Sequence, residues 1–600
     1  MHLRFLLPLI LIYCMGVEIL APPLFCLVSS APPSSNTRCE SVPPPTQPLI
    51  SNVPQAAANQ VSFDVVDVRG LGLTSYETWV LSSLEGHANK NSSRMYVVWD
   101  NDAWNWLQTF NNTDYIGYKR IISNLTDIIQ PYAGEFNGLI VFDPSDGEMG
   151  NIATPLAGVD SALLVPQQVF DTVHAAFHSL PVIKNVTADL QAAGATTRAA
   201  EYAYAFTNYY PLCNKTAFAM FSGAAPANLR EFLVANNLFT TWEPLYVHTD
   251  VPTPPLDPDP PAEHQLFETI LATYPDNTVI YGYMWPDGGN EGVVIKMISA
   301  ANKYLIASDW ISNLAFFSHM QLPTGYQFHQ NRTATVPTIT NKIYLTGIWS
   351  DGDNIQYVQG FMHDILWNDA TRGQVPTGWE INPSLYNLAP YILKYYYDSA
   401  SANDCIVAGL SGAGYCKFDY FTNQTALENF LHISMDLMNK TDMTETRGWQ
   451  IDQTANIVTS IYQLNGIFEG YGGPFQYRTP EIVNGVPIIW PTAIDSGNWE
   501  QVPAFIERLH AAVPNQPVFL YALLHCWSYT QENWTKLVNE LESLGYVDVE
   551  RPDVFAQLAK TWGGDQVQGY LTTINILSIA GFVALLGVAA ARQRKKGEGQ

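Results

Sequence analysis

The chain has 600 residues and a formal net charge of −26, although only 14% of its residues are charged. The negative charge therefore reflects a shortage of Lys and Arg, which argues against nucleic acid as a partner because phosphate binding requires clustered positive charge. Seven cysteines are too few for a disulfide scaffold on this length, and no C-x-x-C or H-E-x-x-H spacing indicates zinc.

The N-terminal residues predict export. Arg4 precedes an apolar run from Phe5 to Met15, which is typical of a signal peptide. We expect the signal to occupy residues 1–31. Pro and Ser are abundant in the stretch that follows, so residues 32–59 are expected to form an extended spacer that cannot pack a core.

Residues 60–255 are predicted to form an N-terminal α/β domain. Apolar runs at 61–68, 95–100 and 138–143 alternate with helix-like stretches, which favours α/β layers. The segment Val251–Gln265 is rich in proline, which excludes both a helix and a central strand. We therefore place a domain boundary there.

Residues 264–560 show a more regular alternation of strands and helices. Strands are expected near 278–284, 304–308, 342–349, 405–410, 448–451, 466–470, 486–490 and 517–524. Helices are expected between them at Ile355–Trp367, Ser384–Ser399, Ala426–Asn439 and Asn498–Ala512. Eight strands in such an alternation predict a (β/α)8-barrel-like domain, with an open doubly wound sheet as the alternative.

The C-terminal residues predict a membrane anchor. Residues 570–591 carry no charge and are long enough, as a helix, to cross the hydrocarbon layer. Basic residues then dominate 592–600, which marks a cytoplasmic tail and places the body outside the cell. We therefore expect a single-pass protein of the cell membrane with an extracellular body.

The predicted extracellular body contains acceptor sequences for N-linked glycans. The N-x-S/T acceptors are Asn91, Asn111, Asn124, Asn185, Asn214, Asn331, Asn423, Asn439 and Asn533. Their position between the signal and the anchor is consistent with a glycoprotein.

In a barrel, catalytic groups lie at the carboxyl ends of the strands. Asp351 and Asp353 follow one predicted strand at alternate spacing, so both side chains could face the same opening. Glu469 and Asp309 follow two other strands. Because glycosidic bonds are cleaved by two carboxyl groups, these four residues are candidate catalysts.

Each catalytic candidate has a structural alternative. The Asp351–Asn354 turn could cap backbone amides or hold a calcium ion. Asp309 could cap the segment that follows it, and Glu469 could be a loop carboxylate. No glycine fingerprint for a nucleotide follows a strand, so no organic cofactor is expected, and calcium is left open.

Polar and aromatic side chains at the same strand ends are candidate sugar-binding groups. They are Trp285, Asn313, Asn354, Tyr415, Tyr471, His525 and Trp527. The aromatic residues would be stacking platforms for sugar rings, whereas His525 could equally be a histidine satisfied within the core. The GLSGAG run around Ser411 has Ala413 where a nucleophile elbow requires glycine, so we interpret it as a glycine-rich turn.

These segments carry a family resemblance. Residues 376–415, PTGWEINPSLYNLAPYILKYYYDSASANDCIVAGLSGAGY, resemble the segment that names the GxGYxYP family of putative glycoside hydrolases. SDGDNIQY at 350–357 is similar to its acidic signature, and VVDVRGL and SSLEGHANKNSSRMYVVWDNDAWNWL are similar to its N-terminal region. The naming motif reads GAGYCKF at 412–418, with Lys417 and Phe418 in place of the final Tyr-Pro. The resemblance implies a barrel and a sugar-directed function.

The sequence thus predicts a membrane-anchored extracellular glycoside hydrolase that acts on an oligo- or polysaccharide through a pair of carboxyl groups. Two alternatives remain at this point. One is a carbohydrate-binding or adhesive protein without catalysis, since a fold does not dictate function. The other is a structural glycoprotein of the cell envelope.

Overall fold

The computed structural model describes residues 61–563, apart from 112–114, 121, 224, 226, 243–259, 285–290, 333–335, 472–474, 476 and 495–497. The expected signal, spacer, membrane helix and tail, together with Trp285, lie outside the described residues. Within the described part, every helix is too short or too polar to cross a membrane.

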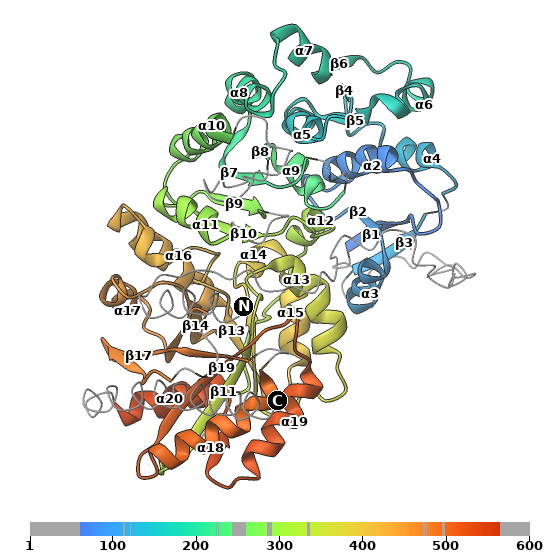
Figure 1. Cartoon of the computed structure of the whole chain (residues 1–600). Coiled ribbons are helices and arrows are strands. Elements are labelled where there is room, and N and C mark those ends of the chain that lie inside the picture. The colour runs from blue at the N-terminus through green and yellow to red at the C-terminus, as the bar shows by residue number, and fades with distance from the viewer. Residues whose placement is uncertain are drawn as a thin grey trace, which may run out of the picture.

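Two small parallel sheets form the N-terminal part, in the upper half of Figure 1. The first has the order β2-β1-β3, with β1 at Val61–Asp67, β2 at Met95–Val98 and β3 at Tyr115–Lys119. The second has the order β5-β4-β6, with β4 at Gly138–Phe142, β5 at Ala162–Pro166 and β6 at Val182–Asn185. The alternation of strands and helices expected for this region is confirmed.

A third parallel sheet, of four strands, has the order β10-β9-β7-β8. Its strands are β7 at Asn214–Met220, β8 at Leu238–Thr241, β9 at Val279–Gly282 and β10 at Tyr304–Ala307. Because β7 pairs with β9, the proline-rich segment connects strands of one sheet. The prediction that 278–284 and 304–308 belong to the barrel is therefore wrong.

The largest sheet fills the lower half of Figure 1. Its parallel strands are β11 at Ile343–Trp349, β12 at Thr377–Ile381, β13 at Asp404–Ala408, β14 at Glu445–Gly448, β15 at Gly466–Glu469, β17 at Val486–Ile489, β18 at Pro491–Ile494, β19 at Val518–Leu524 and β20 at Val547–Val549. The short β16 at Glu481–Val483 pairs antiparallel with β17.

This sheet curls on itself. The strands follow the order β17-β15-β14-β13-β12-β11-β19-β18, and β20 pairs with the first half of β11. Only Trp490 separates β17 from β18, so one stretch of chain pairs with β15 through its first half and with β19 through its second. The sheet is barrel-like, but its strands are not the eight that were predicted.

Two differences explain the miscount. Strand β12 was not predicted, because its Gly378 and Glu380 interrupt the apolar pattern. Strand β14 lies three residues before the predicted 448–451, because its sequence ETRG has no apolar side chain to mark it. Each strand is short and is fixed by its pairing with neighbours on both sides.

The helices cover these sheets. They are α2 Ser75–Ala88, α3 Asn101–Phe110, α4 Leu125–Ile129, α5 Met149–Asp160, α6 Phe170–Ala176, α7 Val186–Ala193, α8 Arg198–Asn208, α9 Arg230–Asn236, α10 Pro260–Thr273, α11 Glu291–Ala300, α12 Leu314–Ser318, α13 Ile355–Gln359, α14 Leu385–Leu388, α15 Pro390–Ser399, α16 Gln424–Lys440, α17 Ala455–Ile461, α18 Val502–Ala512, α19 Gln531–Glu542 and α20 Pro552–Trp562, with a π-helix η4 at Met362–Trp367. The helical segments predicted between the barrel strands are confirmed.

The interior of the curled sheet is apolar at its amino end. Tyr344 and Phe519, near the starts of β11 and β19, belong there to one buried cluster with Phe555 of α20. Helix α20 closes this end, since a Cβ on Gly466, the first residue of β15, would lie 2.8 Å from Cβ of Ala556. Polar groups of the interior are consequently found towards the carboxyl end.

Candidate functional site

The turn after β11 packs closely against the backbone of β12. Asp351 has a φ of 67°, a conformation that residues with a Cβ seldom adopt. Gly352 is required next, because a Cβ there would lie 1.5 Å from the carbonyl oxygen of Glu380. Asn354 then caps α13 by accepting a hydrogen bond from the backbone N–H of Tyr357 at 3.1 Å. The candidate sugar-binding residue Asn354 is therefore occupied as a helix cap.

The side chain of Asp351, which follows β11, contacts residues that follow two other strands. Its Oδ2 accepts a hydrogen bond from Nε1 of Trp527, which follows β19. Its Oδ1 accepts one from the hydroxyl of Tyr471, which follows β15, at 3.4 Å. Asp351 is half-buried, and Trp527 is 54% exposed. Three predicted site residues thus lie together at the carboxyl end of the sheet.

Asp353 lies below Asp351 and is only 6% exposed. Burial, followed by the charges of Glu380 and Asp351, raises the pKa of Asp353 well above its usual value. Arg447 opposes this shift but does not cancel it. Asp353 therefore holds a proton under conditions in which an exposed aspartate would be charged.

Glu380 and Arg447 form a fully buried ion pair beneath these aspartates, with 2.6 Å between Oε2 and Nη1. Glu380 pairs in register with Val407, and Arg447 with Phe468, so both point into the barrel interior. Burial raises the pKa of Glu380 although Arg447 lowers it. We call Asp351, Asp353, Glu380, Arg447 and Tyr471 the carboxyl-end cluster.

The loop that carries the family motif docks onto the third sheet. Tyr415 exchanges backbone hydrogen bonds with Leu305 of β10, at 2.7 and 3.0 Å. Gly414 allows this approach, because a Cβ there would lie 2.7 Å from the Leu305 carbonyl oxygen. The loop therefore fixes Tyr415 between the third sheet and the curled sheet.

Tyr415 contacts one acidic and one aromatic side chain beside the cluster. Its hydroxyl donates a 2.5 Å hydrogen bond to Oε1 of Glu291, the first residue of α11. Its ring stacks on Trp449, with centroids 5.2 Å apart and planes at 14°. Nζ of Lys417 lies 3.8 Å from the centroid of the Trp449 ring. Tyr415 is itself only 3% exposed, so it orients its neighbours rather than offering a free platform.

Glu469 and Asp309 lie outside the cluster. Glu469 accepts a 2.7 Å hydrogen bond from the backbone N–H of Gln450, and burial raises its pKa to about 7. It follows the inward-pointing Phe468, so it starts from the outer face of β15. Burial raises the pKa of Asp309 to about 6, and no carboxyl of the cluster contributes to that shift.

Two of the other predicted binding residues make hydrogen bonds within the protein. Asn313 is completely buried and makes two hydrogen bonds to the backbone of Val97 in β2, at 2.8 and 2.9 Å. Its prediction as a sugar ligand is wrong, because β10 belongs to the third sheet and the loop after it packs against β2. His525 lies after β19 but pairs its Nδ1 with Oγ of Ser528 at 2.8 Å.

Four residues in or beside the cluster were not predicted from the sequence: Glu380, Arg447, Glu291 and Trp449. The first two lie on the strands that were unassigned or displaced in register. A signal for Glu380 was available, because a glutamate inside the stretch TGWEI is unusual for a buried strand. Glu291 had no local signal, since it reaches the site through the packing of a different sheet.

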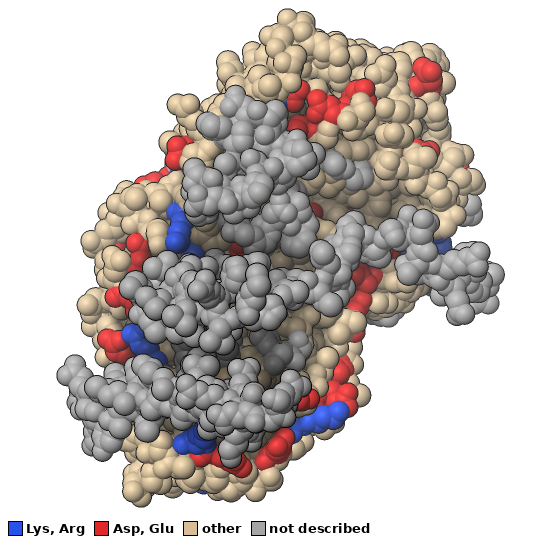
Figure 2. Space-filling model, viewed as in Figure 1, with Lys and Arg blue, Asp and Glu red and all other residues tan. Residues whose placement is uncertain are grey.

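Charged side chains are sparse over the face shown in Figure 2, and acidic ones are the more frequent. Among the described residues, no group of three or more His, Cys, Asp or Glu side chains is placed to hold a metal ion. Calcium at the Asp351–Asn354 turn therefore stays a prediction.

The fold and site define an α/β protein with an acidic, aromatic cluster at the carboxyl end of a curled parallel sheet. Two family profiles match it: "GxGYxYP putative glycoside hydrolase C-terminal domain" over residues 341–560 and "GxGYxYP third domain" over residues 214–319. The chain belongs to the GxGYxYP family. No curated protein sequence matches it.

Solved structures extend the comparison. A crystal structure titled as a putative hydrolase from Bacteroides thetaiotaomicron VPI-5482 superimposes with a TM-score of 0.70 and 22% identity, covering 84% of this chain and 95% of that chain. At this identity the likeness establishes the fold. A probable polysaccharide deacetylase from Pseudomonas aeruginosa PAO1 has a TM-score of only 0.28 with 10% identity, covering 36% of this chain and 91% of that chain, and carries no argument.

Proposed function

We propose that this protein is a glycoside hydrolase that acts on an oligo- or polysaccharide at the carboxyl-end cluster. The observation that carries the proposal is the meeting of β11, β12, β14, β15 and β19 at one group of carboxyl and aromatic side chains. Hydrolysis of a glycosidic bond requires a carboxyl group that holds a proton and a second that acts as nucleophile or base. The family membership supports the same reaction class.

We propose Asp351 as the carboxyl group that acts on the sugar as nucleophile or base. It is half-buried, and hydrogen bonds from Trp527 and Tyr471 hold both of its oxygens. Such fixed orientation is what a nucleophile or base needs to act at one carbon. Asp353 stays protonated underneath and so adds no second negative charge beside Asp351.

Trp527 supplies a surface for the sugar ring. It is 54% exposed, and its ring lies 5.1 Å from that of Phe361, which supports it from one side. An exposed, rigid aromatic face beside a carboxylate suits a ligand that has both apolar C–H faces and hydroxyl groups. Tyr471, 43% exposed, donates to the other carboxyl oxygen of Asp351.

We further propose that the body is extracellular, glycosylated and anchored in the cell membrane through residues 570–591. The exposure of the acceptors supports glycosylation: Asn91, Asn124, Asn185, Asn214, Asn331, Asn423 and Asn439 are exposed, while Asn111 and Asn533 are half-buried. Enzymatic removal of N-glycans from the protein made by its own cells should increase its electrophoretic mobility. Unchanged mobility would contradict glycosylation.

The test of the hydrolase function is release of reducing ends from a polysaccharide panel by the purified full-length protein. Asp351→Asn should lower turnover by about 10²-fold or more, because position-specific acid–base help alone gives about 10²–10⁴-fold. Asp436→Asn is the matched control, because Asp436 is an exposed residue of α16 that pairs with Lys440. If Asp351→Asn and the control retain equal turnover, the site assignment is wrong.

A second candidate is a carbohydrate-binding protein without catalysis. It is favoured by the depth of Asp353 and Glu380, which are 6% and 1% exposed and so lie beneath the reach of a substrate. In that case glycans would bind without release of reducing ends, and Trp527→Ala would weaken the binding. Absence of both binding and cleavage would instead favour a structural glycoprotein of the cell envelope.

A further inference from the structure

A glycosidase needs two carboxyl groups that touch the substrate, and the carboxyl-end cluster offers only one. Asp353 and Glu380 are buried beneath Asp351. A proton donor must come within hydrogen-bond reach of the glycosidic oxygen, about 2.6–3.2 Å. The second group must therefore come from another element that borders Asp351.

Glu291 meets this requirement. It is half-buried and begins α11, which follows β9 of the third sheet and lies where the upper and lower halves of the molecule meet (Figure 1). A series of contacts links Glu291 to Asp351. Tyr415, the donor to Glu291, stacks on Trp449, and the Trp449 ring lies 5.7 Å from the ring of Tyr471, which donates to Asp351. The charge of Asp351 also raises the pKa of Glu291. Glu291 thus shares an electrostatic environment with Asp351, although it belongs to a different sheet.

The position of Glu291 is fixed from both sides. Tyr415 donates its 2.5 Å hydrogen bond from the motif loop of the curled sheet, and Tyr283 donates a second from the end of β9. Lys417 lies beside the first turn of α11, because a Cβ on Gly292 would be 3.6 Å from its Nζ. An isolated surface glutamate would not be held by two tyrosines from two sheets.

We propose that Glu291 is the second catalytic carboxyl of this site, the proton donor that the third sheet contributes beside the carboxyl-end cluster. The inference rests on the proposed hydrolase function and identifies the residue that completes it. As the bond between C1 and the glycosidic oxygen breaks, the Glu291 carboxyl gives its proton to that oxygen, which leaves as an alcohol.

Water supplies the oxygen that ends on C1. It arrives directly if Asp351 takes its proton as a base, or after an ester between C1 and Asp351 has formed and is hydrolysed with Glu291 as the base. In either case the substrate gains one water molecule, and both carboxyls return to their starting states through solvent.

Burial and hydrogen bonding divide the two roles. Burial raises the pKa of Glu291, the neighbouring charge of Asp351 raises it further, and hydrogen bonds from Tyr415 and Tyr283 limit the rise. Two donors hold the oxygens of Asp351 in a fixed orientation for the reaction at C1. The catalytic site would then consist of parts of the third domain and the C-terminal domain together.

The test compares two substrates of the full-length protein. A dinitrophenyl glycoside has a leaving group that departs without a proton, whereas the natural oligosaccharide needs one. Glu291→Gln should lower turnover of the oligosaccharide by about 10²-fold or more and spare the aryl glycoside, in line with the usual gain from a general acid. Asp351→Asn should reduce both. Glu268→Gln, an exposed position on α10, is the control.

A second variant tests the same assignment without removing the carboxyl group. Tyr415→Phe deletes a hydrogen bond that lowers the pKa of Glu291, so the pKa should rise. A proton donor works only below its pKa, so the loss of kcat/KM at alkaline pH should move to higher pH.

Equal losses on both substrates in Glu291→Gln, or an unmoved alkaline limb in Tyr415→Phe, would overturn the role of Glu291 and leave the hydrolase function standing. If the wild-type protein cleaves neither substrate nor any panel glycan, the hydrolase function fails, and the proton-donor role fails with it.

Discussion

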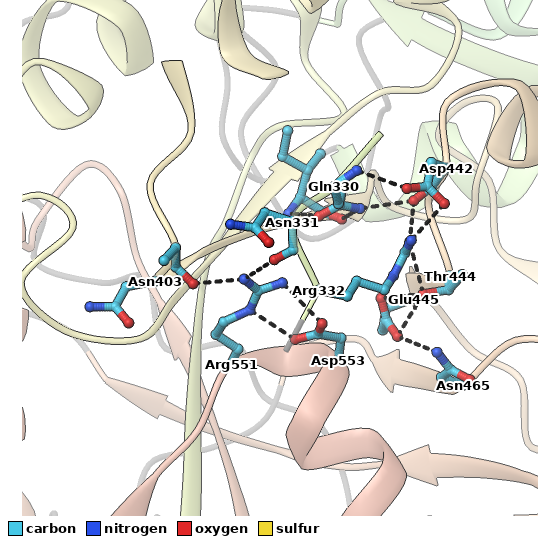
Figure 3. Close-up of polar contacts among 12 residues, drawn as sticks. Gln330, Asn331, Arg332, Asn403, Asp442, Thr444, Glu445, Asn465, Arg551 and Asp553 are labelled. Carbon is cyan, nitrogen blue, oxygen red and sulfur yellow. Dashed lines mark hydrogen bonds and ion pairs between the residues drawn. The ribbon is translucent and has the colours of Figure 1, made fainter. Parts of the chain in front are cut away.

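At the amino end of the curled sheet, each arginine is matched to acceptors that surround it (Figure 3). Arg551 donates to both oxygens of Asp553 at 3.0 and 2.9 Å, and to the backbone carbonyls of Asn331 and Ala402. Arg332 donates to Asp442 at 2.6 Å. At the carboxyl end, the described cluster holds the carboxyl groups of Asp351, Asp353 and Glu380 and one guanidinium, that of Arg447, which pairs with Glu380 and acts on Asp353.

This difference separates charges that hold the fold from charges available for chemistry. A buried cation with a bidentate carboxylate and further carbonyl acceptors has partners for its hydrogen-bond donors. Removing this cation leaves the carboxylate as an unpaired buried charge, which destabilises the fold. Carboxyls in excess of cations instead keep protons and shifted pKa values, which is the usual condition of active-site groups. The amino end should therefore govern stability, and the carboxyl end activity.

The division between the two ends can be tested first at the carboxyl end. Asp351→Asn should lower turnover by at least about 10²-fold, because it removes the charge that we assign to the reaction. The fold should survive, since Asp351 is half-buried and Asn tolerates its positive φ of 67°. Turnover assays and thermal unfolding of the same preparation measure both effects. A large loss of stability would contradict the division of roles.

The reverse experiment removes a cation from the amino end. Arg551→Met should destabilise the protein by about 3–5 kcal/mol, because it leaves Asp553 buried without its partner. Turnover per folded molecule should stay unchanged. Denaturant unfolding and an active-site-normalised rate measure the two quantities. If turnover falls as much as it does in Asp351→Asn, the two ends are coupled and their roles are not separate.

One residue at the amino end, Glu445, differs from the paired charges around it because its pKa is raised. Burial, with the charge of Asp553, raises the pKa of Glu445 to about 7 from its usual 4.5. The folded state then binds more protons than the unfolded state between pH 4.5 and 7, so this group's contribution to stability is full at acidic pH and is lost as pH rises.

Glu445→Gln should remove that dependence. Since Thr444 and Asn465 donate to Oε1 at 2.9 and 3.0 Å, a Gln carbonyl can accept both bonds. The variant should gain up to about 3 kcal/mol over wild type at pH 8 and nothing at pH 4, from the size of the pKa shift. Chemical unfolding across this pH range measures it. A constant difference at every pH would show that Glu445 is charged in the fold.

The smallest effect is expected at the exposed aromatic face. Trp527→Ala removes a stacking surface and one hydrogen bond to Asp351 but leaves its carboxyl group, so KM should rise by about tenfold, or about 1.4 kcal/mol. Turnover at saturation should change less than in Asp351→Asn. Steady-state kinetics separate the two. A loss of kcat with unchanged KM would mean that Trp527 orients Asp351 more than it binds sugar.

The sequence was sufficient for the parts of the site that follow strongly apolar strands. β11, β15 and β19 are predominantly apolar, so Asp351, Tyr471 and Trp527 could be placed just after them. The sequence was insufficient where a strand carries charge, as β14 does, because its register is set by neighbours rather than by its own pattern.

Longer-range packing explains the other differences. Asn313 follows a strand as regular as any in the barrel, but that strand pairs with β9 in another sheet. Glu291 lies beside Tyr415 only because the motif loop docks onto β10. Proximity between residues more than a hundred positions apart depends on the complete fold, and no local pattern encodes it.

The pairing of β11 has a consequence for how the protein is made. Ile343 at its start pairs with Val518 of β19 on one side and with Val547 of β20 on the other. During synthesis β11 leaves the ribosome long before either partner exists, and its open edges are available to other chains until then. The upper sheets can fold meanwhile, but the barrel interior must wait for its last strands and for α20. A stop of translation after β10 but before residue 518 would therefore yield a chain whose N-terminal sheets can fold, followed by an aggregation-prone remainder that lacks the candidate site.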